Sequence, residues 1–258
     1  MNNIHPTAIV SSKAQLGNDI TIGPYSVIYD NVEIGNGTKI GPHVVIYDGA
    51  RIGERVIIHQ GASVANSPQD LKYADEPTLF YIGDDTTIRE CVTLHRGTVA
   101  TGVSRVGKNC LLMAYSHVAH DCTVGDKVIL ANAVQLGGHV EIGDWVILGG
   151  ASLIHQFCKV GAHVMIGGGF KATTDVPPFI LAGRHPLRFE GLNVVGLRRR
   201  GFTSDDISVI KKTYEIFYHS NLLFSEAKVR IKEEFGGNKH ADTVLDFMGK
   251  SKRGILRK

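Results

Sequence analysis

The sequence of 258 residues has a single tryptophan, only four cysteines and no long uninterrupted hydrophobic run. No apolar stretch approaches the roughly 20 residues of a membrane-spanning helix, and the first six residues lack the basic and apolar segments of a signal peptide. The net charge of +3 is too small to indicate a nucleic-acid-binding protein. The cysteines match neither CxxC spacing nor a disulfide framework; they are Cys91, Cys110, Cys122 and Cys158. We therefore expect neither a secreted, nor a membrane-inserted, nor a DNA-binding protein.

Glycine, by contrast, is abundant, with 30 residues, and the sequence contains a repeat of six residues. In steps of six from Ile4 to Ile166, 25 of the 28 positions hold Ile, Leu or Val. The exceptions, Asp70, Glu76 and Ala100, mark two insertions near residues 65–81 and 97–105. Glycine follows the aliphatic residue at 13 of the 28 positions, and the fourth residue after it is usually small or β-branched. This hexapeptide pattern is typical of a parallel β-helix.

Each hexad predicts one short strand and one tight turn. We expect the aliphatic residue to point inward, the glycine to relieve backbone strain at the turn, and the small residue to share the crowded interior. Three hexads close one triangular coil of 18 residues, and successive coils stack at the interstrand spacing of about 4.8 Å. An α-helix would repeat near 3.6 residues and an open strand near 2, and neither period fits.

The repeat fades after Ile166, and Val176–Pro178 ends the strand pairing, because proline cannot donate to a β-ladder. Residues 203–206 can cap a helix whose apolar spacing is set by Ile207, Ile210, Tyr214, Phe217 and Tyr218. Ser225 can cap a second helix that ends at Gly236–Gly237, and a third is expected from Asp242 to about Met248. We therefore divide the chain into a β-helix over residues 1–190 and a helical region over 191–258, which covers the end of the solenoid.

Five histidines are expected outside the β-helix, since aliphatic residues fill its interior. His120, His139 and His155 belong to hexads that begin 18 residues apart, so they should share one face in consecutive coils. His95 and His117 belong to hexads that begin at Leu94 and Leu112, again 18 apart, which places them on the preceding face. Solvated surface histidines, a zinc site and an acid–base site are the possible interpretations. Asp121 directly after His120 favours acid–base chemistry, because a carboxylate can hold one ring nitrogen as a donor and leave the other free to accept a proton.

Seven further segments are distinctive and extend over nearly the whole chain. They are Gln69–Tyr73, Thr93–Thr98, His117–Gly125, Leu136–Val140, Ile154–Cys158, Asp175–Pro178 and Gly196–Phe202. In these segments the sequence resembles the UDP-N-acetylglucosamine O-acyltransferases, a family of hexapeptide-repeat acyltransferases. The repeat alone is shared by many acyltransferases, whereas these segments together are specific. The resemblance implies a left-handed β-helix, although the general preference for right-handed crossovers predicts the opposite hand.

The resemblance implies that a (3R)-hydroxyacyl chain moves from acyl carrier protein to the glucosamine 3-hydroxyl of UDP-N-acetylglucosamine, the first step of lipid A biosynthesis, in the cytoplasm. His120 would be the general base, Asp121 would orient it, and the backbone N–H of Gly138 would stabilise the oxyanion. The hydroxyl attacks the thioester directly, and packing at the small fourth position explains Cys110, Cys122 and Cys158. No metal and no cofactor are implied, since the phosphopantetheine arrives on the carrier protein.

The same resemblance implies substrate-binding residues. The first insertion contributes Gln69, Asp70 and Lys72, and the cleft is lined by His95, His117, His139, His155 and Gln156. Asn193, Arg199 and Arg200 would hold the uridine diphosphate, since arginine can bind phosphate bidentately. Val195 stands where related sequences can carry an acidic nucleotide contact. Gly168 matches the family's acyl-chain ruler and predicts a donor of about fourteen carbons, although Gly167–Gly169 can also be read as a simple turn.

We also expect a homotrimer, because the family is trimeric and a three-sided prism suits cyclic symmetry. One face alone would give a shallow, wet site, whereas a second subunit can supply the other wall. Acyl carrier proteins are acidic and would dock on the cations of the helical region. Acidic residues lie among these cations, so a solvated helix face is the alternative. The cations are Lys211, Lys212, Lys228, Arg230 and Lys232, and the acidic residues are Glu226, Glu233 and Glu234.

Three other functions fit the sequence less well. The related N-acyltransferase that acts two steps later carries an extra N-terminal domain, whereas the hexads here begin at Ile4. A hexapeptide-repeat carbonic anhydrase holds zinc with three histidines between subunits, and a His-Asp pair followed by an arginine run is not its pattern. A non-catalytic scaffold would not need the histidine cluster. The sequence leaves open whether the sugar is N-acetylglucosamine or its 3-amino analogue, which would give an amide.

Overall fold

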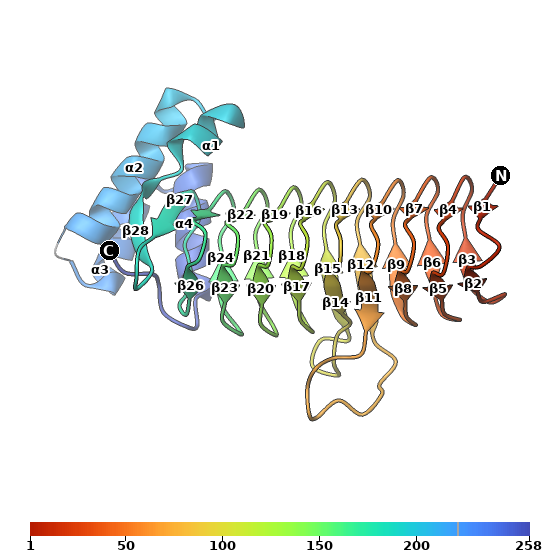
Figure 1. The fold of residues 1–258 in the computed structure, drawn as a ribbon. Helices are drawn as coiled ribbons and strands as arrows, with labels where there is room; N and C mark the ends of the chain where they lie inside the picture. The colour runs from red at the N-terminus through yellow and green to blue at the C-terminus, as the bar shows by residue number, and fades with distance from the viewer. Residues whose placement is uncertain (221) are drawn as a thin grey trace.

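The chain forms a three-sided parallel β-helix followed by a helical region (Figure 1). This computed structural model describes residues 1–220 and 222–258. Each coil contributes one short strand to each of three sheets, which we call faces A, B and C in chain order. The fold class expected from the sequence, a left-handed parallel β-helix with a C-terminal helical region, is confirmed.

The strands of each face are as follows. Face A contains β1 (Asn3–Ile4), β4 (Thr21–Ile22), β7 (Lys39–Ile40), β10 (Ile57–Ile58), β13 (Thr87–Ile88), β16 (Leu111–Leu112), β19 (Ile129–Leu130), β22 (Ile147–Leu148), β25 (Met165–Ile166), β27 (Ile180–Gly183) and β28 (Arg188–Leu192). Face B contains β2 (Ile9–Val10), β5 (Val27–Ile28), β8 (Val45–Ile46), β11 (Ser63–Asn66), β14 (Thr93–His95), β17 (His117–Val118), β20 (Gln135–Leu136), β23 (Leu153–Ile154) and β26 (Lys171–Ala172). Face C contains β3 (Gln15–Leu16), β6 (Glu33–Ile34), β9 (Ala50–Ile52), β12 (Leu79–Ile82), β15 (Val103–Val106), β18 (Thr123–Val124), β21 (Glu141–Ile142) and β24 (Lys159–Val160).

Both insertions leave the solenoid at the same corner, between faces B and C. The first connects β11 to β12 and the second connects β14 to β15, so they project side by side from consecutive coils (Figure 1). They also lengthen the coils: Thr21 pairs with Lys39, 18 residues later, whereas Leu94 pairs with Val118, 24 residues later. Stacking across an insertion therefore departs from the 18-residue step.

The inward positions of the hexads are filled as expected. The aliphatic residues are almost completely buried, with Ile22 1% and Leu136 1% exposed, and the small residues of the fourth position, such as Ser26 and Val128, share the same interior. The expected role of the glycine is wrong. The left-handed backbone falls on the third residue after the aliphatic, as at Tyr25 with φ 58°, whereas the glycine is needed for close stacking. A Cβ on Gly35 would lie 2.6 Å from the backbone of Gly53 in the next coil.

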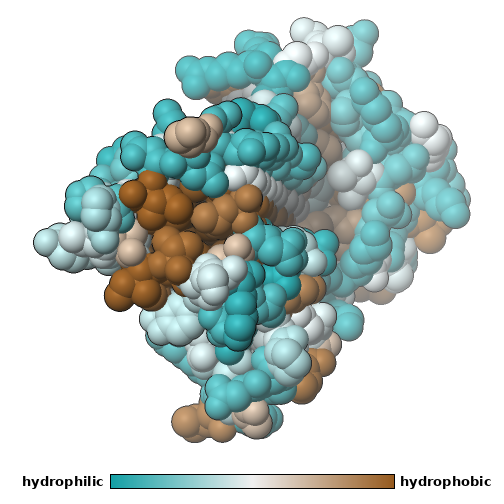
Figure 2. Space-filling view, turned by 90° about the vertical axis from the view of Figure 1, so that its right-hand side faces the viewer, coloured by the Kyte–Doolittle hydropathy of each residue, from teal (hydrophilic) through white to brown (hydrophobic). Residues whose placement is uncertain are grey.

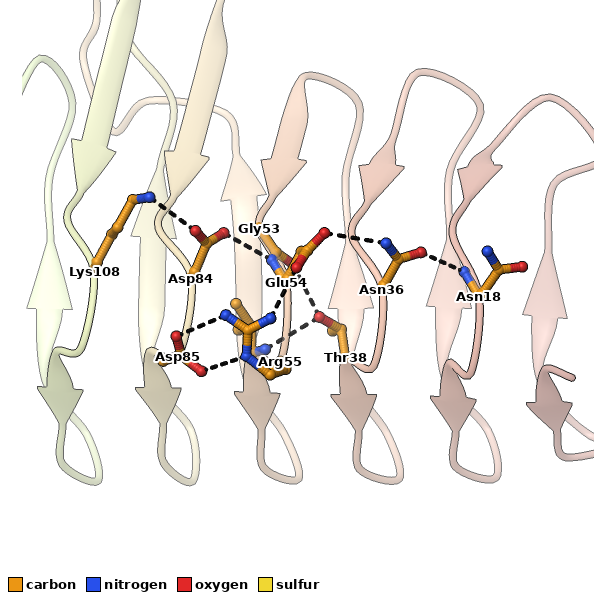
Figure 3. A network of polar contacts seen from close by, with 10 residues as sticks. Asn18, Asn36, Thr38, Gly53, Glu54, Arg55, Asp84, Asp85 and Lys108 are labelled. Atoms are coloured by element: carbon orange, nitrogen blue, oxygen red, sulfur yellow. Dashed lines mark hydrogen bonds and ion pairs between the residues drawn. The ribbon is translucent and has the colours of Figure 1, made fainter.

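A ladder of polar side chains connects the coils at the corner between faces C and A (Figure 3). Its members occupy the second position after the face C aliphatic residue. Asn36 Oδ1 accepts from the N–H of Asn18 at 2.8 Å, and Asp84 Oδ1 accepts from the N–H of Glu54 at 2.9 Å. Asn36 also donates to Glu54, and Lys108 donates to Asp84. Asn36 and Asp84 therefore each satisfy a backbone N–H of the preceding coil, which would otherwise need water.

The C-terminal helices are α1 (Val194–Arg199), α2 (Ser204–His219), α3 (Phe224–Phe235) and α4 (Lys239–Lys250). The cap at Thr203 is confirmed: its side chain accepts from Asp206 N, and Asp206 accepts from the Thr203 N–H. The expected cap at Ser225 is wrong, because α3 begins at Phe224 with Leu223 at the cap position, and the Glu226 carboxylate accepts from Leu223 N at 2.8 Å. The last helix is longer than expected, and Asn238 caps it.

The two ends of the solenoid differ. At the C-terminal end, apolar residues of the helices, among them Leu197 and Ile210, join the core of the β-helix. The buried Asp175 accepts from Ser251 Oγ at 2.6 Å and thereby ties the tail to the last coil. At the N-terminal end, a hydrophobic patch stays uncovered (Figure 2), and Ile4 is 39% exposed. Among the residues described, none of the helices is long and apolar enough to cross a bilayer.

Candidate active site

The histidines expected to form the site gather along face B and its corner with face C. His120 lies two residues after the inward Val118 of β17, and Gly138 and Gln156 hold the equivalent positions in the next two coils. Both insertions project from this corner in the two preceding coils (Figure 1). The repeat therefore supplies a rigid wall, and the insertions supply the irregular backbone that a site needs.

His120 and Asp121 form a hydrogen-bonded pair. Nδ1 of His120 lies 2.8 Å from Oδ2 of Asp121, whose side chain is completely buried, whereas the His120 side chain is 15% exposed. Asp121 occupies the left-handed corner position with φ 59°, a conformation that aspartate tolerates better than most residues. Since Asp121 is ionised, the histidine donates through Nδ1. Its Nε2 is left with a free lone pair that can accept a proton.

The second insertion holds the Asp121 carboxylate in place. The backbone N–H of Thr98 donates to Oδ1 at 3.0 Å, its hydroxyl donates to Oδ2 at 2.8 Å, and the Thr101 hydroxyl also donates to Oδ1. Burial by itself would raise the pKa of Asp121, but the hydrogen bonds from Thr101, His120 and Thr98 outweigh it and lower the pKa to about 2. The carboxylate is therefore charged throughout the neutral range. Sequence reasoning missed both threonines, which the insertion at the same corner could have indicated.

Gly138 packs against the ring of His120. A Cβ atom on Gly138 would lie 2.7 Å from Nε2 of His120, so a side chain there would displace the ring. Among the described residues, no acceptor is bonded to the Gly138 N–H, although the neighbouring N–H groups of Gly137 and His139 donate to Ile154 and His120. A free backbone donor thus lies beside the free nitrogen of the histidine, as an oxyanion site requires.

A cavity of about 390 Å³ opens in front of this pair. It is lined by Gln69 of the first insertion and by residues from five strands or corners of face B. The predicted residues on its wall are Gln69, His95, His117, His120, Gly138, His155 and Gln156. The sequence reasoning did not name three further lining side chains, Gln135, Leu153 and Lys171. They occupy the outward position of face B in successive coils, which the hexad register could have indicated.

The predicted placement of His95 and His117 on a separate face is wrong. Leu94 pairs with Val118 and not with Leu112, because the second insertion adds six residues to that coil. Both histidines therefore lie on face B, with ring centroids 5.0 Å apart. Burial lowers the pKa of His117 to about 4, with smaller contributions from His95 and His120. Nδ1 of His117 lies 2.7 Å from the Thr93 hydroxyl, so this histidine is a neutral hydrogen-bonding group of the wall.

Three other predicted residues lie near the cavity but not on its wall. His139 lies behind the pair, with its Nε2 3.6 Å from Oδ2 of Asp121 and its ring stacked on Phe157 at 4.5 Å. Asp70 and Lys72 lie beyond Gln69 in the first insertion, where Asp70 accepts from the Lys72 N–H at 3.0 Å. Their roles toward a substrate stay predictions.

The residues expected to bind the nucleotide lie elsewhere on the same chain. Arg199 and Arg200 line a second cavity of about 490 Å³ against face A, together with Lys127 and Trp145. Asn193 is 4% exposed and caps α1, accepting from Gly196 N and donating to His163 O. Val195, the departure from the family pattern, is exposed on α1.

Gly168, the predicted acyl-chain ruler, is exposed at the corner between faces A and B, where a Cβ atom would lie 3.1 Å from Gly150 O. This residue does not line the histidine cavity of the single chain. One chain therefore brings together the predicted base and the histidine-lined cavity but not the predicted nucleotide residues or the predicted ruler.

His120, Asp121 and His139 offer three ligand atoms within 4.8 Å of one another, a spacing that a metal ion could use. The hydrogen bonds of Asp121 weigh against this use. One carboxylate oxygen already accepts from Thr98 and His120, and the other accepts from Thr98 and Thr101. These donors fill the lone-pair positions that a metal would need. The arrangement is that of a hydrogen-bonded orienting carboxylate.

Three of the four cysteines are placed as structural residues, whereas Cys91 is exposed. Cys110, Cys122 and Cys158 are 3%, 0% and 0% exposed in the interior of the β-helix, which confirms their packing role. Burial raises the pKa of Cys110 to about 11, of Cys122 to about 12 and of Cys158 to about 11. Because the thiolate is the nucleophile, these protonated thiols do not offer one.

Comparison with known proteins gives matches over the whole chain. Residues 175–256 match the family model described as "Udp N-acetylglucosamine O-acyltransferase; Domain 2", and residues 13–48, 31–66 and 104–138 match the bacterial transferase hexapeptide model. An acyl-[acyl-carrier-protein]–UDP-N-acetylglucosamine O-acyltransferase of Chlorobaculum parvum is 54% identical over 98% of this chain and 97% of its own.

Solved structures agree with this match. The UDP-N-acetylglucosamine O-acyltransferase of Moraxella catarrhalis is 40% identical with a TM-score of 0.95 and covers 98% of this chain and 99% of its own. The UDP-N-acetylglucosamine acyltransferase of Francisella novicida is also 40% identical, has a TM-score of 0.96, and covers 99% and 94%. The chain is an acyltransferase and belongs to the family of acyl-[acyl-carrier-protein]–UDP-N-acetylglucosamine O-acyltransferases.

Proposed function

We propose that this protein transfers an (R)-3-hydroxyacyl chain from acyl carrier protein to the glucosamine 3-hydroxyl of UDP-N-acetylglucosamine, the first step of lipid A biosynthesis, in the cytoplasm. The observation that carries the proposal is the position of His120, between a buried carboxylate at Nδ1 and the free N–H of Gly138 beside Nε2. A general base and an oxyanion donor within reach of one point are what direct acyl transfer requires.

The reaction follows from this geometry. Nε2 of His120 takes the proton of the sugar hydroxyl as its oxygen attacks the thioester carbonyl. The negative charge that develops on the carbonyl oxygen is stabilised by the Gly138 N–H. The tetrahedral intermediate then collapses, the C–S bond breaks, and the thiol of the phosphopantetheine arm leaves with the proton from His120. Asp121 stabilises the transient imidazolium, and no protein nucleophile takes part.

The proposal includes a homotrimer, which the outward side chains support. Face C carries charged residues that pair between coils, such as Arg51 with Glu33 at 3.0 Å and Lys159 with Glu141 at 2.6 Å. Face A instead presents mainly aliphatic residues from Leu111 onward, of which Met165 is 40% exposed. The outward aliphatic residues of face A are Ile57, Leu111, Ile129, Ile147 and Met165. An apolar face of this kind is typical of a subunit interface.

The two cavities also fit such an assembly. The histidine cavity uses Gln135 and Leu153 on face B, and the arginine cavity uses Ile129 and Ile147 on face A of the same two coils. A rotation axis parallel to the solenoid keeps every residue at its height. It can therefore place face A of one subunit against face B of its neighbour, with Arg199 and Arg200 opposite His120. The phosphates and the acceptor hydroxyl would then be bound by two chains.

The acyl carrier protein is proposed to dock on the helical region. Lys211 and Arg230 border a largely apolar cavity of about 730 Å³ between β28, α2 and α3. Both cations have acidic neighbours, since Lys211 lies 3.7 Å from Glu215 and Arg230 lies 2.7 Å from Glu234. Acidic side chains of the carrier would compete with Glu215 and Glu234 for these two cations. Because salt screens such exposed charges, the KM for the acyl carrier should rise with ionic strength.

The test is acyl transfer by purified protein with 3-hydroxymyristoyl carrier protein and UDP-N-acetylglucosamine. We expect His120→Ala to lower kcat by about 10²-fold or more, whereas His59→Ala, at a corner outside the cavity, keeps the rate. Equal activity of His120→Ala and wild type would remove His120 as the base. Absence of transfer together with stoichiometric zinc in the protein would indicate the metal-site alternative. Carriers of ten to fourteen carbons, and the 3-amino sugar, test the chain length and the acceptor in the same assay.

A further inference from the structure

A column of side chains that includes two flat rings runs along the corner between faces C and A, a different corner from that of His120. Lys127, Trp145 and His163 occupy the same corner position in consecutive coils, with φ values of 57°, 62° and 62°. The Trp145 and His163 rings are nearly parallel, 12° apart with centroids separated by 6.4 Å, and His163 stacks in turn on Phe179 at 5.6 Å. The repeat therefore builds a stack of rings on the outside of the solenoid.

Arg200 lies against this column. Its Cζ atom lies 5.1 Å from the centre of the Trp145 ring, and its Nη1 lies 3.2 Å from Nδ1 of His163. Nζ of Lys127 also lies over the Trp145 ring, at 4.4 Å. Burial lowers the pKa of His163 to about 4, with smaller contributions from the charges of Arg200 and His240. His163 is therefore neutral at neutral pH, and its Nδ1 accepts from the guanidinium.

The surroundings of Arg200 indicate that it is held for an anion. The side chains bordering its cavity include the cations of Lys127, Arg199 and Arg200, and none of the bordering residues is acidic. The contact with His163 uses Nη1, so Nη2 and Nε are left to form a planar pair of donors for a phosphate. His163 also accepts through its carbonyl oxygen from Asn193, which caps the short helix α1 directly before Arg200. His163 thus contacts Asn193 and Arg200, the residues at the two ends of α1.

We propose that Trp145 and His163 are positioning residues that hold the Arg200 guanidinium in the orientation in which it binds the diphosphate of the sugar nucleotide. The inference rests on the proposed function, in which Arg200 contacts UDP, and adds the residues that orient it. An arginine restrained before binding loses less side-chain freedom when the phosphate arrives. The effect of removing Trp145 or His163 should therefore appear in the affinity for the nucleotide and not in the rate of acyl transfer.

Two substitutions separate positioning from packing. His163→Phe keeps a ring for the stack but removes the acceptor for Arg200. Trp145→Leu removes the flat surface, and Trp145→Phe is the matched conservative variant that restores it. We expect His163→Phe and Trp145→Leu to raise the KM for UDP-N-acetylglucosamine and the Kd for UDP about tenfold. We expect kcat and the KM for the acyl carrier to stay within about twofold, and Trp145→Phe to recover most of the nucleotide affinity.

The single tryptophan of the chain gives a direct readout of binding. UDP should change the emission of Trp145 saturably in wild type and in His163→Phe, with the midpoint shifted in the variant, and calorimetry gives the Kd of the Trp145 variants. In a double-mutant cycle, adding His163→Phe to Arg200→Ala should cost little more than Arg200→Ala alone, because both remove the same contact. Thermal unfolding midpoints show whether a variant has lost its fold.

The outcomes are distinguishable. Folded His163→Phe and Trp145→Leu proteins with wild-type Kd and KM values overturn the inference while leaving the proposed function in place. Fully additive effects of His163→Phe and Arg200→Ala also overturn it, since His163 would then act independently. A wild-type protein that neither transfers the acyl chain nor binds UDP overturns the proposed function and, with it, this inference. A tenfold loss of affinity with kcat retained supports positioning.

Discussion

A Cβ atom built on Gly138 would lie 2.7 Å from Nε2 of His120. The glycine is therefore required by the position of the histidine ring. We expect Gly138→Ala to displace the ring and to lower kcat by about 10²-fold, within the range for loss of a general base. Gly150→Ala is the matched control, because Gly150 holds the same hexad position and its Cβ would come no closer than 3.4 Å to a neighbour. Equal kcat values for the two variants, measured with saturating substrates, would argue against this geometry.

The low pKa of Asp121 predicts a pH dependence of stability. This carboxyl has a pKa of about 2 in the folded protein, well below the usual range of an aspartate. The ionised form therefore stabilises the fold above about pH 4, and the stabilisation is lost as the pH falls toward 2. We expect the urea midpoint of wild type to fall more steeply between pH 4 and pH 2 than that of Asp121→Asn. Parallel curves for the two proteins would show that the hydrogen bonds from Thr98 and Thr101 do not stabilise the charge.

The fold could be predicted from the sequence because the hexad is a local pattern repeated along the chain. The phase from Ile4 to Ile166 determines which residues point inward, and the structure buries nearly all of them. The reason for the glycines could not be read in the same way, because the close approach of Gly35 to Gly53 depends on how coils stack. The antiparallel pairing of β27 with β28 has no hexad signal and was not expected.

The site was predictable where a residue type carries its own chemistry. His120 with Asp121 is such a case, since the adjacent pair is visible in the sequence. Thr98 and Thr101 were missed, because a threonine becomes a carboxylate ligand only through the path of the insertion. The face of His95 was misassigned for a similar reason: the added residues shift the stacking from 18 to 24. Long-range register is what the sequence alone leaves undetermined.

The first insertion is held by a contact between Tyr73 and Arg96. Nε and Nη2 of Arg96 donate to the Tyr73 hydroxyl at 2.9 and 2.6 Å, and Nη1 donates to Asp48 O at 2.9 Å. We expect Tyr73→Phe to loosen the segment that carries Gln69 and to raise the KM for UDP-N-acetylglucosamine by about 3–10-fold. Because the His120 pair is untouched, kcat should stay within about twofold.

Steady-state kinetics and limited proteolysis of the insertion check this expectation. Tyr81→Phe is the control, since Tyr81 lies on face C and is 44% exposed. Faster cleavage within the insertion of Tyr73→Phe alone would support the anchoring role. A KM and a cleavage rate equal to those of the control would mean that other contacts of the insertion suffice to hold it.

Close stacking of the coils predicts opposite effects for two glycine substitutions. A Cβ on Gly35 would lie 2.6 Å from the backbone of Gly53, and backbone cannot move aside as a side chain can. We expect Gly35→Ala to lower the free energy of unfolding by about 1–3 kcal/mol through overpacking. In α4, a Cβ on Gly249 meets nothing within 4 Å, so Gly249→Ala should raise it by about 0.5–1 kcal/mol. Urea unfolding of both variants tests the pair: destabilisation by both would indicate that any added methyl group is harmful, whereas opposite signs would show that the glycines of the hexads are fixed by the distance between coils.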